Sequence, residues 1–218
     1  MIKRKNIIKI AIDSPAAAGA GTIGKAISKH YNLFYLDTGK IYRFVAYQKL
    51  KFPKKFNQKF IKSKIKSLKK KDLSNKILLS DYVGNEASII AKIKSIRKMV
   101  HKFQINFAYN PPKKYKGSCL DGRDITYNII PDADFKFYIT ANVKTRAKRR
   151  FRELKSLKKN ISYKEVLKSI KKRDKNDFNR KISPLKKTKD SLLINTTNLN
   201  KRACFLKIKK IIDRKINI

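Results

Sequence analysis

AIDSPAAAGAGTIGK, residues 11–25, passes from an apolar segment into a run of small residues and then into apolar positions with helical spacing. This order predicts a strand, a tight turn and a helix. A helix N-terminus behind such a turn is an arrangement in which backbone N–H groups bind phosphate. Phosphate loops carry lysine where Ala20 stands here, which raises the question of whether a nucleotide site can work without it.

The predicted turn is built from residues with small side chains. Such residues let the backbone approach an anion closely, and Thr22 stands where a hydroxyl would hold Mg²⁺. Compared alone with the pattern G-x-x-x-x-G-K-[ST], the stretch matches poorly, and an alanine-rich helix start explains it equally well. The candidate phosphate-binding residues are Ser14, Pro15, Ala16, Ala17, Ala18, Gly19, Ala20, Gly21 and Thr22.

Strands and helices alternate along the remainder of the chain. The hydrophobic pattern predicts strands over 6–13, 33–39, 117–122, 134–141 and 190–196. Helices are expected over 20–31, 40–50, 85–109, 143–155, 162–178 and 199–215. This alternation indicates an α/β fold with a doubly wound, five-stranded parallel sheet. Ligands bind beyond the carboxyl ends of such strands, where three unusual short segments fall: 14–22, 37–39 and 121–124.

Length and composition fit one domain with a small insertion. The chain has 218 residues, of which 41% are hydrophobic, so it can bury a sizeable core. No apolar run approaches the length of a membrane span, and we expect the basic start to lead into a buried strand and not to be a signal peptide. Cys119 and Cys204 have neither disulfide nor metal-ligand spacing, so we expect free thiols and a cytoplasmic location.

The formal net charge of +42 invites a nucleic-acid interpretation. However, the 45 lysines and 12 arginines are spread from end to end, and Ile, Lys and Asn dominate the whole chain. This distribution favours a composition bias over a shaped polyanion surface. We therefore expect nucleic acid to bind only non-specifically, while the charge attracts phosphorylated substrates.

Four segments in order, AIDSPAAAGAGT, YLDTGKIYR, LDGRD and KRDKNDFNR, resemble those of bacterial cytidylate kinases, members of the nucleoside monophosphate kinases among the P-loop NTPases. The resemblance covers most of the chain and implies transfer of the γ-phosphoryl group of ATP to CMP or dCMP with Mg²⁺. It implies one kinase domain over 1–218, acting as a monomer, with a helical lid over 151–182. Residues 51–84 correspond to the family's monophosphate-binding insert, which carries a small sheet in the family and is shorter and more basic here.

The phosphate loop departs from the family at three positions. The family's loop reads Gly-Pro-x-Gly-x-Gly-Lys-Gly-Thr, whereas Ser14 and Ala17 replace two glycines and Ala20 replaces the lysine. Backbone donors and the helix dipole survive these changes, but the lysine's charge does not. Loss of one preorganised donor costs about 3–4 kcal/mol in catalysis. Lys25 lies on another helix face, so basic residues of the lid are better substitutes. From the sequence we expect Ala20→Lys to raise turnover if the loop can seat the new side chain, and no gain would mean that another cation fills the place.

Arginine is notable in a chain whose default cation is lysine, because its planar fork binds phosphate with two hydrogen bonds. The resemblance implies that Thr38 lies near cytosine or its phosphate, that Arg43 binds the monophosphate and that Arg97 reads the base. Asp124 is an acceptor that would select the N4 amino group of cytosine over the carbonyl of uracil. A turn-capping aspartate is the structural alternative.

The family pattern Arg-Asp-x-x-Asp-x-x-Arg is matched by KRDKNDFNR. Arg173, Asp177 and Arg180 share a helix face, where ion pairs within the helix are the alternative to arginines on the transferring phosphates and an aspartate on the sugar. The implied catalytic residues are Arg173, Arg180 and Asp121, and the implied metal ligands are Thr22 and Asp121. The implied CMP-binding residues are Thr38, Arg43, Arg97, Arg123, Asp124, Arg173, Asp177 and Arg180, and the lid or adenine residues are Arg146, Arg149 and Arg150.

Two other functions fit part of the pattern. The shortened insert is compatible with a related nucleotide kinase of altered specificity, which a screen of monophosphate substrates would distinguish. The basic charge and Ala20 are compatible with an RNA-binding protein on a decayed kinase fold, which RNA binding without ATP turnover would identify.

Overall fold

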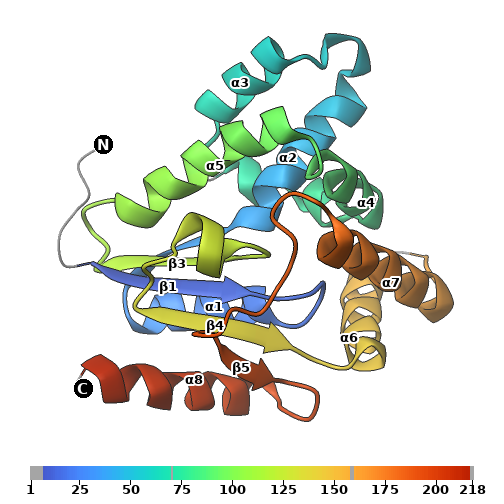
Figure 1. Ribbon diagram of the computed structural model, residues 1–218. Coiled ribbons are helices and arrows are strands. Elements are labelled where there is room, and N and C mark those ends of the chain that lie inside the picture. Colours follow the sequence, from blue (N-terminus) through green and yellow to red (C-terminus); the bar gives the residue numbers. More distant parts are fainter. Residues whose placement is uncertain (1–6, 70, 158–159, 217–218) are drawn as a thin grey trace.

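The computed structural model describes residues 7–69, 71–157 and 160–216, and at its centre lies a sheet of parallel strands (Figure 1). The strands follow the order β2-β3-β1-β4-β5. Their bounds are β1 Ile8–Asp13, β2 Leu33–Asp37, β3 Gly117–Gly122, β4 Phe135–Thr140 and β5 Leu192–Asn195. The predicted α/β fold with a five-stranded parallel sheet is confirmed.

Helices cover both faces of the sheet because side chains alternate between the faces along each strand. Ile10 and Ile12 of β1 belong to the core packed by α1 and α8, whereas Ala11 belongs to the core packed by α2 and α5. The sheet is therefore doubly wound, as predicted. The longer helices are α1 Ala20–His30, α2 Thr38–Lys51, α3 Gln58–Lys66, α4 Asp81–Ile90, α5 Lys94–Tyr109, α6 Val143–Ser156, α7 Tyr163–Asn179 and α8 Lys201–Ile216.

The segment proposed as the monophosphate insert, 51–84, is helical in its described part. It contains α3, the start of α4 and three short 3₁₀ turns, Pro53–Lys55, Asp72–Ser74 and Lys76–Leu79, with no strand among its described residues. Ile61, Ile65 and Leu78 are buried in the core shared with α2 and α5. The lysine-dense segment is therefore anchored by a few apolar side chains, and α3 stands at the end of the molecule farthest from α8 (Figure 1).

One predicted helix, 85–109, is in fact two. α4 ends at Ile90 and α5 begins at Lys94, with Ile93 in an extended conformation between them. The break contains neither glycine nor proline, and apolar positions continue through it, so the pattern could not reveal it. The break frees the carbonyl of Ala91 from the helix, and Arg97 Nη1 donates to this carbonyl at 3.1 Å. The arginine thereby pairs a buried backbone acceptor that would otherwise have no hydrogen bond.

α6 and α7 form a helical hairpin beside the sheet (Figure 1). Ala147, Leu154, Val166 and Ile170 make a small core of their own between the two helices. α7 begins with a capping box at Ser162, which fixes where the helix starts. Most of the predicted lid, 151–182, lies in this hairpin and the segment after it, while 158–159 fall outside the described residues.

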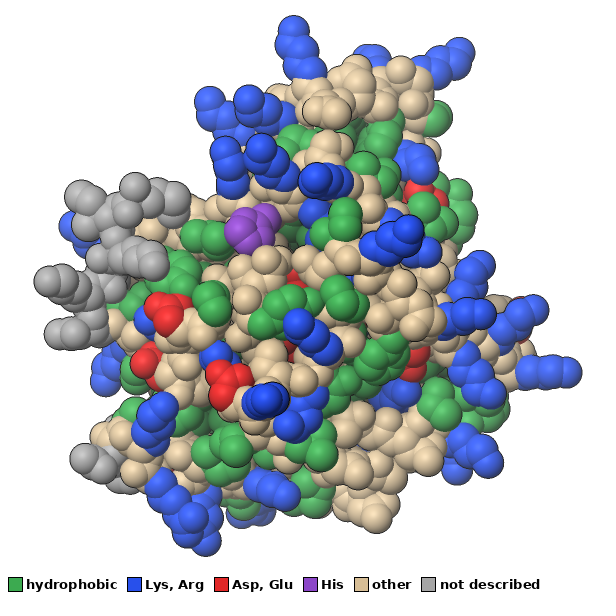
Figure 2. Space-filling view, viewed as in Figure 1, with side chains coloured by type: hydrophobic (Ala, Val, Ile, Leu, Met, Phe, Trp, Pro, Cys, Tyr) green, Lys and Arg blue, Asp and Glu red, His purple; other side chains and the backbone are tan. Residues whose placement is uncertain are grey.

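Basic side chains are distributed over the whole visible face of the molecule and are not gathered in one patch (Figure 2). This supports the interpretation of the charge as a composition bias. Cys119 and Cys204 are buried free thiols. No helix in the described part of the chain has the length and apolarity that a membrane crossing requires.

Candidate active site

The phosphate loop, residues 14–19, joins β1 to α1 through two residues with positive φ. Gly19 has a φ of 97° and Ala17 has a φ of 59°. The left-handed region is open to glycine but costs an alanine about 1–2 kcal/mol. Ala17 is therefore strained at a position where the cytidylate kinase pattern has glycine, and the loop makes its turn in spite of the added Cβ.

Backbone N–H groups are the main donors of the loop. The first hydrogen bond of α1 runs from Ile23 N to Gly19 O at 3.1 Å, so the N–H groups just before it have no acceptor inside the helix. Ala16 N donates to Asp174 Oδ1 of α7 at 3.3 Å, which shows that the loop accommodates an oxyanion. Ala20 is only 4% exposed and contributes a methyl group where a phosphate loop has an ammonium group.

Arg146 of α6 ties this loop to the predicted lid. Its Nη1 donates to Ala16 O at 3.0 Å and pairs with Asp174 at 2.7 Å. The charge of Arg146 is therefore neutralised by the same carboxylate that occupies the Ala16 N–H. An adenine contact by Arg146 stays a prediction.

Arg149 and Arg150 point to different places although they are neighbours in α6. Arg149 donates to Thr196 Oγ1 at 2.9 Å and to Thr196 O at 2.5 Å, in the segment after β5. Arg150 pairs with Asp81 of α4 at 3.1 Å, and the side chains of this pair are 8% and 17% exposed. Arg149 thus lies beside the phosphate loop, and Arg150 joins the hairpin to the insert.

Asp121, at the end of β3, faces the start of α1. Its Oδ1 accepts a hydrogen bond from Tyr35 Oη at 2.9 Å, and its Oδ2 lies 3.6 Å from where a Cβ on Gly21 would stand. Burial raises the pKa of Asp121 to about 8, and the nearby Asp37 adds to the shift. A cation would relieve this crowding of carboxylates. The exposed hydroxyl of Thr22 and the buried carboxylate of Asp121 are therefore suitable ligands for Mg²⁺.

The described residues contain no group of three or more His, Cys, Asp or Glu side chains that could hold a metal ion by themselves. Mg²⁺ commonly keeps several waters and uses one or two protein oxygens together with the phosphates of its substrate. The two protein oxygen ligands offered by Asp121 and Thr22 are consistent with such a coordination of Mg²⁺.

Thr38 and Arg43 belong to α2, which starts where β2 ends. Thr38 Oγ1 donates to Asp121 O at 2.8 Å, so this hydroxyl holds two strand ends together. Arg43 Nη1 donates to the carbonyls of Leu78 and Ser80 at 2.5 and 2.9 Å. Within the described chain Arg43 has no carboxylate partner at ion-pair distance.

Two other guanidinium groups, the half-buried Arg173 and the buried Arg150, lie near the half-buried Arg43. Burial lowers the pKa of Arg43 to about 9, and the positive charges of Arg173 and Arg150 add to the shift. Arg173 of α7 makes no hydrogen bond with the described residues, and burial together with Arg123 lowers its pKa as well. A Cβ on Gly84 would stand 2.6 Å from Arg43 Nη2, so glycine is what lets this guanidinium lie against α4. Guanidinium groups that repel one another without a counterion form a site for an anion.

Arg97 and Asp124 form a buried ion pair next to the carboxyl end of β3. Arg97 Nη2 lies 2.5 Å from Asp124 Oδ2, and the two side chains are 8% and 5% exposed. Asn128 Nδ2 donates to the same Oδ2 at 2.8 Å and also reaches Ser183 Oγ at 3.2 Å. The hydrogen bonds of Asp124 with described side chains all use Oδ2, and none is formed by Oδ1.

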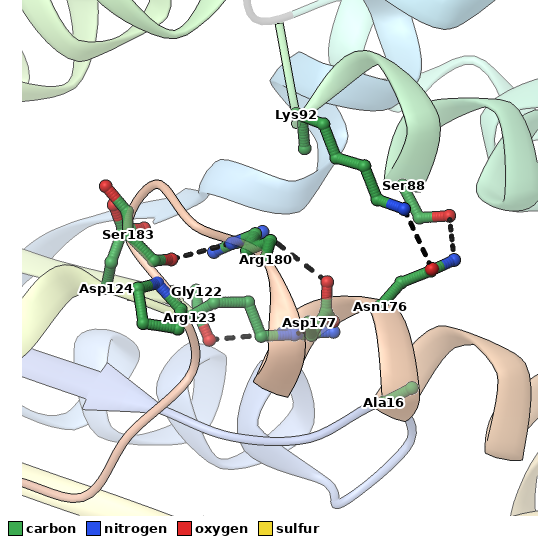
Figure 3. Close-up of polar contacts among 12 residues, drawn as sticks. Ala16, Ser88, Lys92, Gly122, Arg123, Asp124, Asn176, Asp177, Arg180 and Ser183 are labelled. Carbon is green, nitrogen blue, oxygen red and sulfur yellow. Dashed lines mark hydrogen bonds and ion pairs between the residues drawn. The ribbon is translucent and has the colours of Figure 1, made fainter. Parts of the chain in front are cut away.

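Arg123, Asp177 and Arg180 form a second ion-pair group next to Asp124 (Figure 3). Arg123 Nε lies 2.7 Å from Asp177 Oδ2, and Arg180 Nη1 lies 3.4 Å from Asp177 Oδ1. Burial alone would raise the pKa of Asp177, but Arg123 and Arg180 outweigh burial and hold it below the usual value. The ion-pair alternative of the sequence is present, and it coexists with a shared cluster at the strand ends.

Asp13 is a buried residue beside the site for which the sequence analysis predicts no role. Its carboxylate accepts hydrogen bonds from Ile125 N at 2.8 Å and from Thr126 N and Oγ1 at 3.0 and 2.6 Å. Burial raises its pKa to about 6 against the effect of these hydrogen bonds. The available signal was a carboxylate at the end of a strand directly before the small-residue loop.

Asn176 bridges the hairpin and the α4–α5 region (Figure 3). Lys92 Nζ donates to Asn176 Oδ1 at 2.9 Å, and Asn176 Nδ2 donates to Ser88 Oγ at 3.4 Å. Nothing in the pattern marked these residues, because their positions become adjacent only when α7 folds over α4.

Comparisons with known proteins agree with this geometry. A family model described as "Cytidylate kinase" matches residues 10–214. The cytidylate kinase of Bartonella tribocorum is 44% identical over 197 residues, covering 90% of each chain, and that of Mesomycoplasma hyopneumoniae strain 7448 is 37% identical over 222 residues, covering 96% of this chain and 95% of the relative. A crystal structure of an uncharacterized protein from Eubacterium ventriosum matches with a TM-score of 0.55 at 18% identity, covering 94% of this chain and 98% of that one, and supports the fold alone.

Proposed function

Because the chain belongs to the cytidylate kinase family, we propose that it transfers the γ-phosphoryl group of ATP to CMP or dCMP, with the residues of the candidate site in the roles given below. An oxygen of the acceptor's phosphate attacks the γ-phosphorus in line, and the bond from this phosphorus to the β–γ bridging oxygen breaks. The products are ADP and the cytidine diphosphate. Positioning and charge neutralisation supply most of the catalysis in such transfers, and no protein nucleophile is needed.

The observation that carries the proposal is a pair of half-buried guanidinium groups, Arg43 and Arg173, that have no carboxylate at ion-pair distance among the described residues. Each has its pKa lowered by burial and by neighbouring cations, so each gains when an anion binds between them. Arg43 extends from α2 beside the insert, and Arg173 extends from α7. We assign Arg43 to the acceptor's phosphate and Arg173 to the phosphoryl group in transfer.

The base and sugar of the acceptor are assigned to the ion-pair groups. Asp124 Oδ1 accepts the N4 amino group of cytosine, while Arg97 holds the carboxylate in place through Oδ2. The O4 carbonyl of uracil would face that carboxylate without a proton to offer, so UMP is disfavoured. Asp177 binds the sugar, and Arg123 and Arg180 contact the phosphates alongside it.

The donor's phosphates are assigned to the N–H groups of residues 14–22 and to the N-terminus of α1. Thr22 and Asp121 would hold Mg²⁺, which neutralises phosphate oxygens when bound. Arg146, which already contacts the loop at Ala16 O, orients the adenine side of the nucleotide.

We further propose that 51–84 and 151–182 act as insert and lid that close over the nucleotides, and that the enzyme is a cytoplasmic monomer whose contacts with nucleic acid are non-specific. The free thiols of Cys119 and Cys204 support a reducing compartment.

A coupled assay with ATP and Mg²⁺ over CMP, dCMP, UMP and AMP tests the function. We expect kcat/KM for CMP and dCMP to be at least about a hundredfold higher than for UMP. Uracil has no amino group at this position, so its binding would leave the buried carboxylate of Asp124 unpaired. Equal turnover of UMP would contradict the role of Asp124. No turnover of any monophosphate, together with tight RNA binding at physiological salt, would replace the kinase by the RNA-binding alternative.

A further inference from the structure

The phosphate loop lacks a cation of its own, so a kinase built on it needs positive charge from elsewhere. Basic side chains near the loop in the described structure include Arg146, Lys25 and Arg149, which are the three compared below. What separates them is whether a carboxylate already neutralises their charge.

Arg146 is close to the loop, but a carboxylate already neutralises its charge. It pairs with Asp174 at 2.7 Å, and both side chains are largely buried, at 7% and 13% exposed. Lys25 stands on α1 with its Nζ 6.0 Å from the ring of Tyr35, whose hydroxyl donates to Asp121 Oδ1 at 2.9 Å. The charge of Lys25 therefore serves the carboxylates of the expected metal site.

Arg149 is the member of the three whose charge is held by neutral groups alone. Its guanidinium donates to Thr196 Oγ1, Thr196 O and Leu199 O at 2.9, 2.5 and 3.3 Å. It has no carboxylate at ion-pair distance in the described part of the chain. Neutral acceptors fix the position of a guanidinium without cancelling its charge, so the charge remains available to an anion.

The position of Arg149 is beside the loop. Its Nη1 lies 4.0 Å from where a Cβ on Gly19 would stand, one residue before Ala20. Thr196 Oγ1, to which Arg149 donates, itself donates to Ala18 O at 3.1 Å, so the guanidinium is tied to the loop through one hydroxyl. A site that holds a cation rigidly against a phosphate loop costs little reorganisation when phosphate binds.

We propose that Arg149 supplies, from α6, the positive charge on the donor's phosphates that lysine at position 20 supplies in other phosphate loops. The inference rests on the proposed function and deepens it, because it names the cation that lets the loop work with alanine. Arg149 is then a residue of the ATP site and not a solvated charge of the helix.

Arg149→Gln tests this, with Arg152→Gln as the matched control, since Arg152 is exposed on the same helix and has no role in the site. We expect Arg149→Gln to lower kcat/KM for ATP by roughly 10²-fold while the KM for CMP changes less than about threefold. The control stays within about twofold. Calorimetric titration of ATP without acceptor gives a second readout, in which Arg149→Gln weakens binding and Arg152→Gln does not.

The decisive variant is the double substitution Ala20→Lys/Arg149→Gln. If Arg149 acts through its charge, a lysine on the loop restores turnover to within about tenfold of the starting protein, even where the melting temperature stays lowered. Failure of Ala20→Lys to rescue would overturn the inference and make Arg149 a packing residue at Thr196, as would an unchanged Arg149→Gln enzyme. If the unsubstituted protein phosphorylates no monophosphate, the proposed function fails, and the ATP titrations still decide the role of Arg149.

Discussion

The acceptor side and the donor loop of this site are built from different materials. The acceptor side consists of charged side chains in mutual contact, such as Arg97 with Asp124 and Arg123 with Asp177. The donor loop consists of backbone N–H groups around small residues, with a methyl group at Ala20. A site made of side chains depends on each residue type, whereas a site made of backbone tolerates replacement wherever the turn survives. This explains how the loop has lost a lysine and two glycines relative to the family pattern.

The largest effect is expected from Asp124→Asn. Loss of one partner leaves Arg97 as a buried, uncompensated charge, which costs about 3–5 kcal/mol of stability. Loss of the acceptor for the N4 amino group should lower kcat/KM for CMP by roughly 10²–10³-fold while the KM for ATP stays unchanged. Urea unfolding and a coupled assay measure the two effects.

Asp190→Asn is the control for that substitution, because it breaks an ion pair with Lys136 in which the carboxylate is 58% exposed. Exposed pairs contribute about 0–1 kcal/mol. Comparable losses at the two positions would show that the acceptor side does not depend on its particular charges.

Asp13 joins the two regions, since it ends the strand before the loop and holds the segment after Asp124. Its folded pKa, about 6, is above the ordinary value of 3.8 for an aspartate. The stability that this raised pKa provides is present below about pH 4 and is lost as pH rises through about 6, an effect of about 3 kcal/mol.

Urea midpoints of the unsubstituted protein and of Asp13→Asn, measured from pH 4 to pH 7, test this. The stability of the unsubstituted protein relative to the variant should fall between about pH 4 and pH 6 and then level off. A difference that does not vary with pH would mean that Asp13 is charged in the fold across the whole range.

The sheet was predictable because each strand carries its own apolar run, and the strand ends then brought the charged segments together. The break between α4 and α5 was not, since apolar spacing continues across Ile93 and neither glycine nor proline marks the end of α4. The insert's helix α3 was missed because Ile61 and Ile65 are few among many lysines. The described residues of 51–84 form no strand.

The site shows the same division. Motif blocks named Arg123, Asp124 and Asp177 from the chain alone, and the structure brings them together; their assigned roles stay predictions. No pattern could say that Arg149 and Arg150 diverge to Thr196 and Asp81, because neighbouring positions on a helix point about 100° apart and only the fold decides what each meets.

A smaller effect is expected from Ala17→Gly in the loop. Ala17 has a φ of 59°, so glycine removes strain at that position, although it also adds freedom to the unfolded chain. We expect a net gain of up to about 1 kcal/mol in unfolding free energy, with turnover within about twofold. Ala18→Gly, at a neighbouring residue without positive φ, should instead lose stability. A gain from both would mean that the loop is limited by crowding and not by the conformation of Ala17.

The smallest effect is expected from Ala20→Lys alone. In most phosphate loops a lysine at this position is indispensable, so a new lysine would raise turnover strongly if the place were empty. Because Arg149 already holds a charge beside Gly19, we expect a change of less than about threefold in kcat for CMP phosphorylation, in contrast to the rescue expected once Arg149 is removed. A gain of more than about tenfold in steady-state assays would show that the loop lacks its cation after all. The donor loop would then depend on one side chain, at position 20, as the acceptor side depends on its charged residues.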